Sequence, residues 1–346
     1  MNGGDNGGDQ PAICDLVSEI DLALRDADKP LVSIVLTCRN SEVFLRDTLQ
    51  SVYAQTYKNW ELIAVDDAST DSTPKILEEA AGGDQRIKVI RHDVCSGRPS
   101  ISKNTGLKHA KGDFISFLDH DDLLLSRKIE VLLDALQQNT SCVASFHDLS
   151  YIDGEGKIGA RYLSNFKKDA VDYLALKNNS IYVCNDKFYV FQSLKYAALH
   201  TITCMIAPKR IPLGHSIYFN TDYNVCDDTD LWIRLGLMGE IVYVDEVHAQ
   251  YRIHGNNITS NYLKFHRDIV LCINNNKRRL IGKLSSNEMN SLNKRLAAAY
   301  ADLGWSLRRE HKPLQAARAY FRSFVTAPSW LPLIAAFKAW MPISTR

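Results

Sequence analysis

The sequence has no marked excess of either charge sign. Its 346 residues contain 41 Lys and Arg against 40 Asp and Glu, which leaves a formal net charge of +1. A protein that binds nucleic acid over a broad surface usually carries a clear basic excess, and a protein with an acidic tail carries the opposite. The charge balance therefore favours neither class, and we expect no nucleic-acid partner.

Long apolar runs and closely paired cysteines are also missing. No run reaches the roughly 18 residues typical of a transmembrane helix. The N-terminal MNGGDNGGDQ lacks the basic start and the apolar stretch of a signal peptide. The eight cysteines include no C-x-x-C pair, so reduced thiols are expected rather than a disulfide framework. These absences predict a cytoplasmic location.

The composition that is present is that of a folded globular protein, with 45% apolar and 23% charged residues. The chain is long enough to bury a large core. The Gly-rich, polar residues 1–12 are expected to be disordered, and apolar residues at helical spacing predict a short helix over 13–27. Residues 1–28 are therefore interpreted as an extension that precedes the main domain.

From Leu31 onward the pattern alternates between buried strands and helices. Four apolar segments are typical of strands: 31–37, 61–65, 86–90 and 113–118. Helices are predicted from near Ser41, through Leu77 and over 100–110. Strands that recur at regular intervals with helices between them predict βαβ units and a parallel sheet.

Beyond residue 145 the alternation weakens. Residues 151–160 have the Gly-rich turns of a hairpin, and a helix is predicted over 227–239, closed by Gly239. The chain then returns as strand and loop over 240–257, and from Tyr262 onward its pattern is almost wholly helical. The second half is therefore expected to complete the sheet and then add helices.

Acidic side chains follow two of the predicted strands. Asp66 and Asp67 close the second strand, and Asp119-His120-Asp121-Asp122 closes the fourth. In open α/β sheets, ligands bind beyond the carboxyl ends of the strands. Both acidic clusters should therefore share one rim of the sheet, which we call the active edge.

Carboxylates gathered at one edge raise one another's pKa, and a bound cation relieves the repulsion. Asp119-x-Asp121 has the residue types and the spacing to offer oxygen ligands to Mg²⁺ or Mn²⁺. The alternative is a solvated Asp-rich turn that caps the next helix. A calcium loop of the EF-hand type is excluded, because Leu124 occupies the position where that loop requires Gly.

Several motifs occur in a fixed order along the chain. They are V-S-I-V-L-T (32–37), Q-T-Y-K-N-W-E-L-I-A-V-D-D (55–67), K-N-T-G (103–106), F-L-D-H-D-D (117–122), D-D-T-D-L-W (227–232) and Y-R-I-H-G-N-N (251–257). This series strongly resembles the family-2 glycosyltransferases with the GT-A fold, over roughly residues 31–260. The resemblance implies an α/β fold: a Rossmann-like, mostly parallel sheet flanked by helices over 29–260, with an α-helical C-terminal extension over 261–346.

The resemblance places the nucleotide at the ends of the first two strands. Thr37, Arg39 and Asp67 match the positions that hold the base and ribose, with Asp67 accepting from the uracil N–H. For Thr37 the alternative is a strand-end hydroxyl that satisfies local backbone. Arg39 departs from the frequent aromatic residue of the family, and it would either stack on the base or reach a phosphate.

The resemblance also assigns residues to the sugar, the diphosphate and the metal. Asp119 matches the first Asp of the family's D-x-D, near the ribose and sugar, and Asp121 matches the metal ligand. Lys103 and Asn104 match a basic-Asn pair that faces the donor; an exposed helical Lys is the alternative. His254 would contact the diphosphate or complete the metal site. The implied cofactor is Mn²⁺ or Mg²⁺.

Asp227-Asp228 matches the acidic motif of the acceptor side, although the family more often has Glu-Asp there. Asp228 aligns with the catalytic base that takes a proton from the acceptor hydroxyl as its oxygen attacks the anomeric carbon. The resemblance implies inversion at that carbon, with no enzyme nucleophile. Capping of the following helix by either Asp is the alternative interpretation.

The C-terminal region has a pattern of its own. Apolar and small residues from Tyr300 to Pro328 have the spacing of one tetratricopeptide repeat, although a plain amphipathic helical hairpin has a similar stripe. The final WLPLIAAFKAWMPISTR would suit peripheral contact with the inner face of a membrane, or core packing.

Three functions are compatible with these patterns. The first is a metal-dependent inverting glycosyltransferase that moves a sugar from a nucleotide-diphosphate donor, UDP-linked, to a hydroxyl of a saccharide, lipid-linked or protein acceptor. The second is a sugar-phosphate nucleotidyltransferase, which would want a Gly-rich loop where this chain has T-C-R-N-S-E. The third is a non-catalytic sugar- or protein-binding module. Intact Asp121 and Asp228 favour the first.

Overall fold

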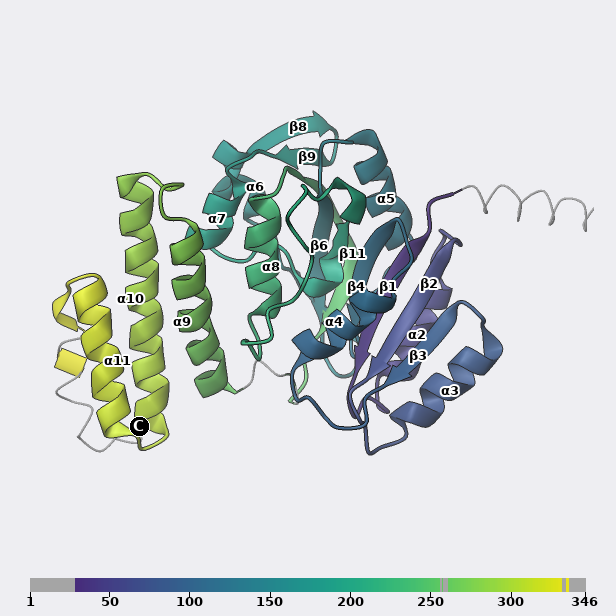
Figure 1. The fold of residues 1–346 in the computed structure, drawn as a ribbon, viewed down its shortest axis with the longest axis horizontal. Coiled ribbons are helices and arrows are strands. Elements are labelled where there is room, and N and C mark those ends of the chain that lie inside the picture. Colours follow the sequence, from purple (N-terminus) through teal and green to yellow (C-terminus); the bar gives the residue numbers. More distant parts are fainter. Residues whose placement is uncertain (1–28, 256, 258–260, 332–333, 336–346) are drawn as a thin grey trace, which may run out of the picture.

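The computed structural model describes residues 29–255, 257, 261–331 and 334–335. The predicted helix over 13–27 and most of the apolar C-terminal segment lie outside the described residues. The described chain forms one sheet with helices on both faces, and a row of three further helices extends from one side of it (Figure 1).

The first half of the sheet is parallel, as the alternating pattern predicts. Its strands follow the order β3-β2-β1-β4. They are β1 (Val32–Cys38), β2 (Trp60–Asp66), β3 (Ile87–Arg91) and β4 (Phe114–Asp119). The register pairs Thr37 with Asp119 and Cys38 with Asp66. Both acidic clusters therefore lie at the same edge, which confirms the predicted active edge.

The second half of the sheet has mixed polarity and continues the order as β10-β6-β11-β9-β8. β10 runs antiparallel between β4 and β6, whereas β6 and β11 are parallel to each other. The predicted hairpin over 151–160 is confirmed as β6 paired with β7. The strands are β5 (Leu123–Leu124), β6 (Ala144–Ile152), β7 (Ile158–Arg161), β8 (Leu174–Asn178), β9 (Ile181–Cys184), β10 (Cys204–Ile206) and β11 (Ile241–Arg252).

Helices cover both faces of the sheet because its central strands are apolar on both sides. Val32, Ile34 and Leu36 of β1 belong to one core, and Val35 belongs to the other. The first core includes α2 (Leu45–Tyr53), α3 (Thr73–Gly83) and α5 (Lys128–Gln138). The second includes α4 (Pro99–His109), α6 (Phe166–Asp169), α7 (Phe188–Leu194) and α8 (Asp227–Gly236).

Two predicted helix boundaries are wrong. The helix expected from near Ser41 begins at Leu45. It follows a turn in which the Ser41 carbonyl accepts hydrogen bonds from the N–H groups of Phe44 and Leu45. The helix expected to run to Gly239 ends at Gly236, where the backbone tightens into i→i+3 bonds. Trp60 and Trp232, which have no role in the predicted chemistry, are both buried in the cores.

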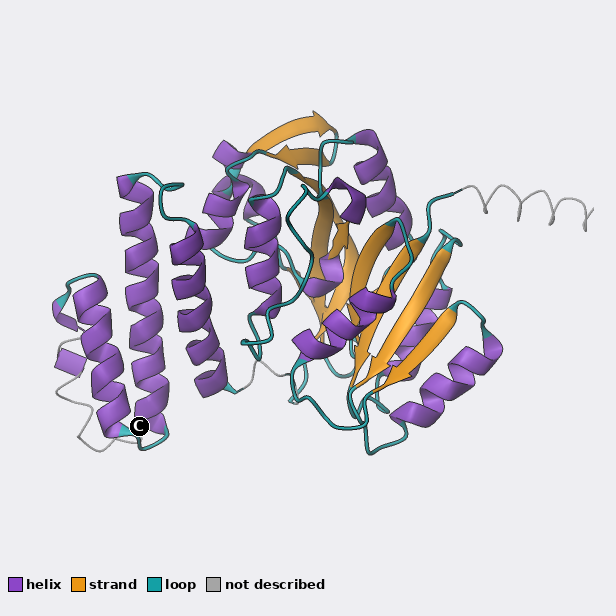
Figure 2. Ribbon diagram, in the orientation of Figure 1, coloured by secondary structure: helices purple, strands orange, loops and turns teal. Residues whose placement is uncertain are grey.

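Three antiparallel helices span residues 262–326 of the described chain: α9 (Tyr262–Arg279), α10 (Ser286–Arg309) and α11 (Pro313–Thr326) (Figure 2). A capping box between Ser285 and Glu288 starts α10. Gly304 lies beneath the Tyr320 ring, where an added Cβ would be 2.8 Å from the ring carbons. This close contact shows that α10 and α11 pack tightly against each other as a helical hairpin. No described helix is long and apolar enough to span a membrane.

Gly106 of α4 provides a test of how closely this helix packs on the sheet. A Cβ at Gly106 would overlap the Val35 side chain, whereas a Cβ at Gly82 of α3 would meet nothing within 4 Å. We expect Gly106→Ala to lower the free energy of unfolding by about 1–3 kcal/mol through overpacking. Gly82→Ala, the matched control, should raise it by up to about 1 kcal/mol through helix propensity. Chemical denaturation measures both, and equal effects of the two substitutions would contradict the packing.

Candidate active site

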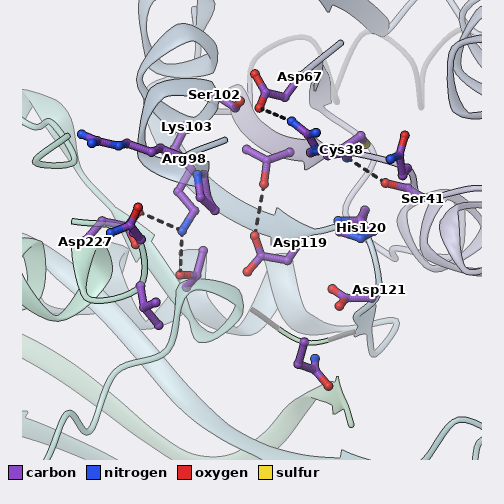
Figure 3. A pocket seen from close by; sticks show the side chains of 18 of the residues that line it. Cys38, Ser41, Asp67, Arg98, Ser102, Lys103, Asp119, His120, Asp121 and Asp227 are labelled. Atoms are coloured by element: carbon purple, nitrogen blue, oxygen red, sulfur yellow. Dashed lines mark hydrogen bonds and ion pairs between the residues drawn. The ribbon is translucent and has the colours of Figure 1, made fainter. Parts of the chain in front are cut away.

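A cavity of about 680 Å³ opens at the active edge. Eight of the nine residues predicted for the site line it: Thr37, Arg39, Asp67, Lys103, Asp119, Asp121, Asp228 and His254. They come from the last residues of β1 and β4, from the loops after β1, β2, β4 and β11, and from helices α4 and α8. Figure 3 shows Asp67, Asp119 and Asp227 approaching the cavity from three separate segments.

Asp67 anchors the loop that leads from β3 into α4. Its Oδ1 accepts from the Ser96 N–H (2.9 Å) and contacts His92 Nδ1 (2.9 Å), and its Oδ2 accepts from the Gly97 N–H (3.0 Å). Burial opposes the charge, but the hydrogen bonds from His92, Ser96 and Gly97 hold the pKa of Asp67 below its usual range. Arg39 lies 3.6 Å away from the carboxylate. The side chain is therefore a fixed, ionised acceptor at the cavity wall.

The acidic turn after β4 is held against the end of β11. Asp122 is fully buried, and its Oδ1 accepts from the Arg252 N–H at 2.8 Å. This bond brings Asp121 beside His254, with Asp121 Oδ2 and His254 Nε2 2.9 Å apart. Asp119 accepts from the Thr37 hydroxyl at 3.2 Å, so Thr37 bonds a neighbouring strand end rather than local backbone. Asp119 and Asp121 consequently present oxygens to the same cavity.

These side chains fit part of a divalent-metal shell. Within the described residues, no group of three or more His, Cys, Asp or Glu side chains is arranged to hold a metal by itself. Mg²⁺ and Mn²⁺ are commonly held by one or two carboxylates, with water and substrate phosphates completing the shell. Asp121, with a nearby His254 nitrogen, suits that incomplete arrangement. A metal here would depend on the substrate for its remaining ligands.

A buried ion pair joins α4 to α8. Lys103 Nζ lies 3.1 Å from Asp227 Oδ2, and both side chains are nearly inaccessible (Figure 3). Lys103 also donates to the Thr201 hydroxyl at 3.4 Å. Burial disfavours the ammonium, but the carboxylates of Asp227 and Asp119 hold the pKa of Lys103 above its usual value. Lys103 is therefore not the exposed helical lysine of the alternative interpretation.

Asp228, next to this pair, faces the cavity. Its Oδ1 accepts from the Thr229 N–H and its Oδ2 from the Thr201 hydroxyl at 3.4 Å. The helix N-cap is Cys226, so neither Asp caps α8, which decides against the capping interpretation. Burial raises the pKa of Asp228, although the Lys103 ammonium partly offsets this rise. A carboxylate with a raised pKa is a stronger base than an ordinary aspartate.

Asn104 does not line the cavity, unlike the other predicted residues. Its Nδ2 donates to the Phe219 carbonyl and its Oδ1 accepts from the Phe219 N–H, both at 2.7 Å. Both ends of the amide are thus used to fix the loop that precedes α8. Arg98 reaches the same loop by donating to the Thr221 carbonyl. The geometry gives Asn104 a positioning role instead of a contact with the donor.

His200 and Tyr251, to which the sequence analysis gave no role, also line the cavity. The His200 ring packs edge-on against Tyr251, with centroids 5.0 Å apart, and both residues line the cavity. Burial lowers the pKa of His200 to about 4, so its imidazole is neutral near pH 7. No sequence motif surrounds His200, whereas Tyr251 begins the Y-R-I-H-G-N-N motif (251–257) but was given no role in it. His92, in contrast, directly follows β3, and the strand-end rule would have found it.

Comparison with known proteins agrees with this geometry. The sequence profile of glycosyl transferase family 2 matches residues 33–195. An uncharacterized glycosyltransferase of Haemophilus influenzae is 31% identical over 235 residues, which cover 67% of this chain and 68% of the relative. The UDP-Glc:alpha-D-GlcNAc-diphosphoundecaprenol beta-1,3-glucosyltransferase WfgD of Escherichia coli is 29% identical, over 68% of this chain and 83% of its own length.

Solved structures share the fold at low sequence identity. TarS of S. aureus in complex with UDP-GlcNAc superimposes with a TM-score of 0.60 at 18% identity, over 86% of this chain and 81% of that one. The mannosyltransferase PcManGT of Pyrobaculum calidifontis, in complex with GDP-Man and Mn²⁺, gives a TM-score of 0.53 at 18% identity, over 95% of this chain and 90% of that one. The chain therefore belongs to glycosyltransferase family 2, with the GT-A fold and an activity directed at nucleotide-sugar donors.

Proposed function

We propose that the protein is a metal-dependent, inverting glycosyltransferase. It moves a sugar from a UDP-linked donor to a hydroxyl of a growing glycan or lipid-linked saccharide. The observation that carries this proposal is the single cavity into which Asp67, Asp121 and Asp228 all face. The similarity to WfgD, whose name specifies a UDP-sugar donor and a diphosphoundecaprenol-linked acceptor, supports both substrate classes.

On the donor side, fixed polar groups bind the nucleotide. Asp67 is held as an ionised acceptor and suits the N–H of a uracil ring. The Arg39 side chain is about half-exposed beside Asp67. It can reach into the cavity to stack on the base or to contact a phosphate. Asp119 lies next to Thr37 at the neighbouring strand end and suits the ribose and sugar hydroxyls. Lys103 adds positive potential at the cavity wall, although its ammonium is bonded to Asp227.

On the acceptor side, Asp228 is the general base. It would take the proton from the acceptor hydroxyl while that oxygen forms a bond to the anomeric carbon and the bond to the nucleoside diphosphate breaks. Attack on the face opposite the leaving group inverts the anomeric configuration. Lys103 neutralises the adjacent Asp227, and the Asp119 carboxylate adds to the rise in the pKa of Asp228.

Asp121, with His254, would hold the divalent cation. When bound, such a cation neutralises the charge that develops on the leaving diphosphate. The hydrogen bond between Asp121 and His254 keeps both side chains at one point of the cavity wall. The Asp122–Arg252 bond, in turn, keeps the acidic turn in place.

A donor screen tests the proposal directly. The protein is incubated with Mn²⁺ and with UDP-glucose, UDP-GlcNAc or GDP-mannose in turn, and the slow release of nucleoside diphosphate is measured. We expect release from at least one UDP-sugar, faster with a saccharide acceptor. No release from any donor, together with no Mn²⁺-dependent binding of UDP, would instead support a non-catalytic binding module.

Two substitutions separate the roles of the carboxylates. Asp228→Asn should retain Mn²⁺-dependent UDP binding and lower kcat by about 100-fold or more, because the general base is lost. Asp121→Ala should weaken that binding itself, because a metal ligand is lost. Isothermal titration with UDP and steady-state transfer kinetics measure the two effects. Equal loss of UDP affinity in both variants would contradict the division of roles.

The raised pKa of Asp228 predicts that the acid limb of the pH profile of kcat/KM lies at a higher pH than for an ordinary aspartate. Only the ionised carboxylate accepts a proton, so transfer is lost as the pH falls through this pKa. Since burial raises the pKa of Asp228, the acid limb of kcat/KM should lie above the value of about 4 that an ordinary aspartate gives. UDP affinity measured over the same pH range serves as the control. A limb at or below the ordinary aspartate value would argue against Asp228 as a buried base.

A further inference from the structure

The wall of the cavity next to the proposed base is held by the C-terminal helices. Asn224 and Val225 line the cavity just before α8. Their backbone N–H groups both donate to Oδ2 of Asp268, at 2.8 Å for Val225. The Asn224 side-chain amide donates to Oδ1 of the same residue at 3.3 Å. Asp268 belongs to α9 and is only 4% exposed.

A second set of contacts joins the far end of α9 to α8 itself. Arg279, the last residue of α9, pairs with Asp230. Asp230 is fully buried and also accepts from Arg234 at 2.9 Å, one turn further along α8. Between these two points, Asn275 donates to the Tyr223 hydroxyl at 2.8 Å. Helix α9 thus contacts the 223–230 segment on both sides of Asp228.

The contacts of Asp268 differ from ordinary helix packing in their directionality. Apolar side chains tolerate small displacements, whereas a carboxylate that accepts two adjacent backbone N–H groups fixes the position of that backbone. The bonds are also buried, so water does not readily replace them if they are broken. Only two residues, Cys226 and Asp227, separate Val225 from Asp228. A shift of Val225 would therefore move Asp228.

We propose that Asp268 is a positioning residue for sugar transfer, acting through the Asn224–Val225 backbone on Asp228. This inference rests on the proposed role of Asp228 as the general base. The helices beyond residue 261 then belong to the catalytic unit on its acceptor side. The donor side, formed by Asp67 and Asp121, is held by the loops at the edge of the sheet.

Two substitutions of Asp268 and one control test the proposal in the full-length protein. Asp268→Ala removes all three acceptor contacts, and it should lower kcat for transfer by about tenfold or more. UDP affinity in the presence of Mn²⁺ should stay within about twofold, because the donor residues lie on other elements. Asp268→Asn retains one oxygen for the two backbone N–H groups and should restore most of kcat. Asp302→Asn, an exposed change on α10, is the charge-matched control and should behave as wild type.

Hydrogen exchange provides a readout that does not depend on turnover. Peptides that cover residues 222–229 should exchange faster in Asp268→Ala than in wild type, while those that cover residues 62–67 should not change. If the alanine variant fails to fold, Asp268→Glu takes its place. It keeps the carboxylate but displaces it by one methylene, so kcat should fall while UDP binding persists.

Two results would overturn the inference. One is a folded Asp268→Ala or Asp268→Glu protein with wild-type kcat and unchanged exchange over residues 222–229. The other is a loss of UDP affinity as large as the loss of transfer, which would indicate a general structural role. A wild-type protein that transfers no sugar would contradict the proposed function instead, and the exchange measurement would still test the contact between α9 and the segment before α8.

Discussion

The buried pair of Lys103 and Asp227 is the interaction on which the site depends. It joins α4, whose N-terminal loop is held by Asp67, to α8, which carries Asp228. Removing either partner of such a pair leaves an uncompensated buried charge, a change that typically destabilises a protein by about 3–5 kcal/mol. The pair therefore holds together the α4 and α8 sides of the cavity, which are the proposed nucleotide-binding and acceptor-binding sides, and it leaves the carboxylate of Asp228 as the proposed base.

The sheet and its active edge could be predicted from the sequence because they depend on local patterns. Apolar runs mark β1, β2 and β4, and in a parallel sheet the carboxyl ends of such strands meet at one edge. Asp67, Asp119 and Asp121 lie at or just beyond the ends of those strands, so their convergence follows from topology alone. The family resemblance then supplied Asp228 and His254, which lie on α8 and after β11, far away in the sequence.

The rest of the site depends on contacts that no local pattern encodes. Asn104 lies beside Lys103 on α4, yet the turn of the helix directs its amide to the Phe219 backbone and away from the cavity. The contacts of Asp268 with Asn224 and Val225 join residues more than forty positions apart in sequence. No spacing in the sequence predicts either contact, because each forms only where a packed helix meets a loop.

Strand β10 runs antiparallel to β4 and β6, so it brings side chains to the cavity from its first residues and not from its last. Parallel strands deliver residues to the active edge where they end, but a strand that runs the other way begins at that edge. The three-residue β10 is therefore preceded there by His200 and Thr201, which line the cavity together with the strand-end aspartates. Because of this one short antiparallel strand, residues that precede a strand and residues that end or follow one line the same cavity.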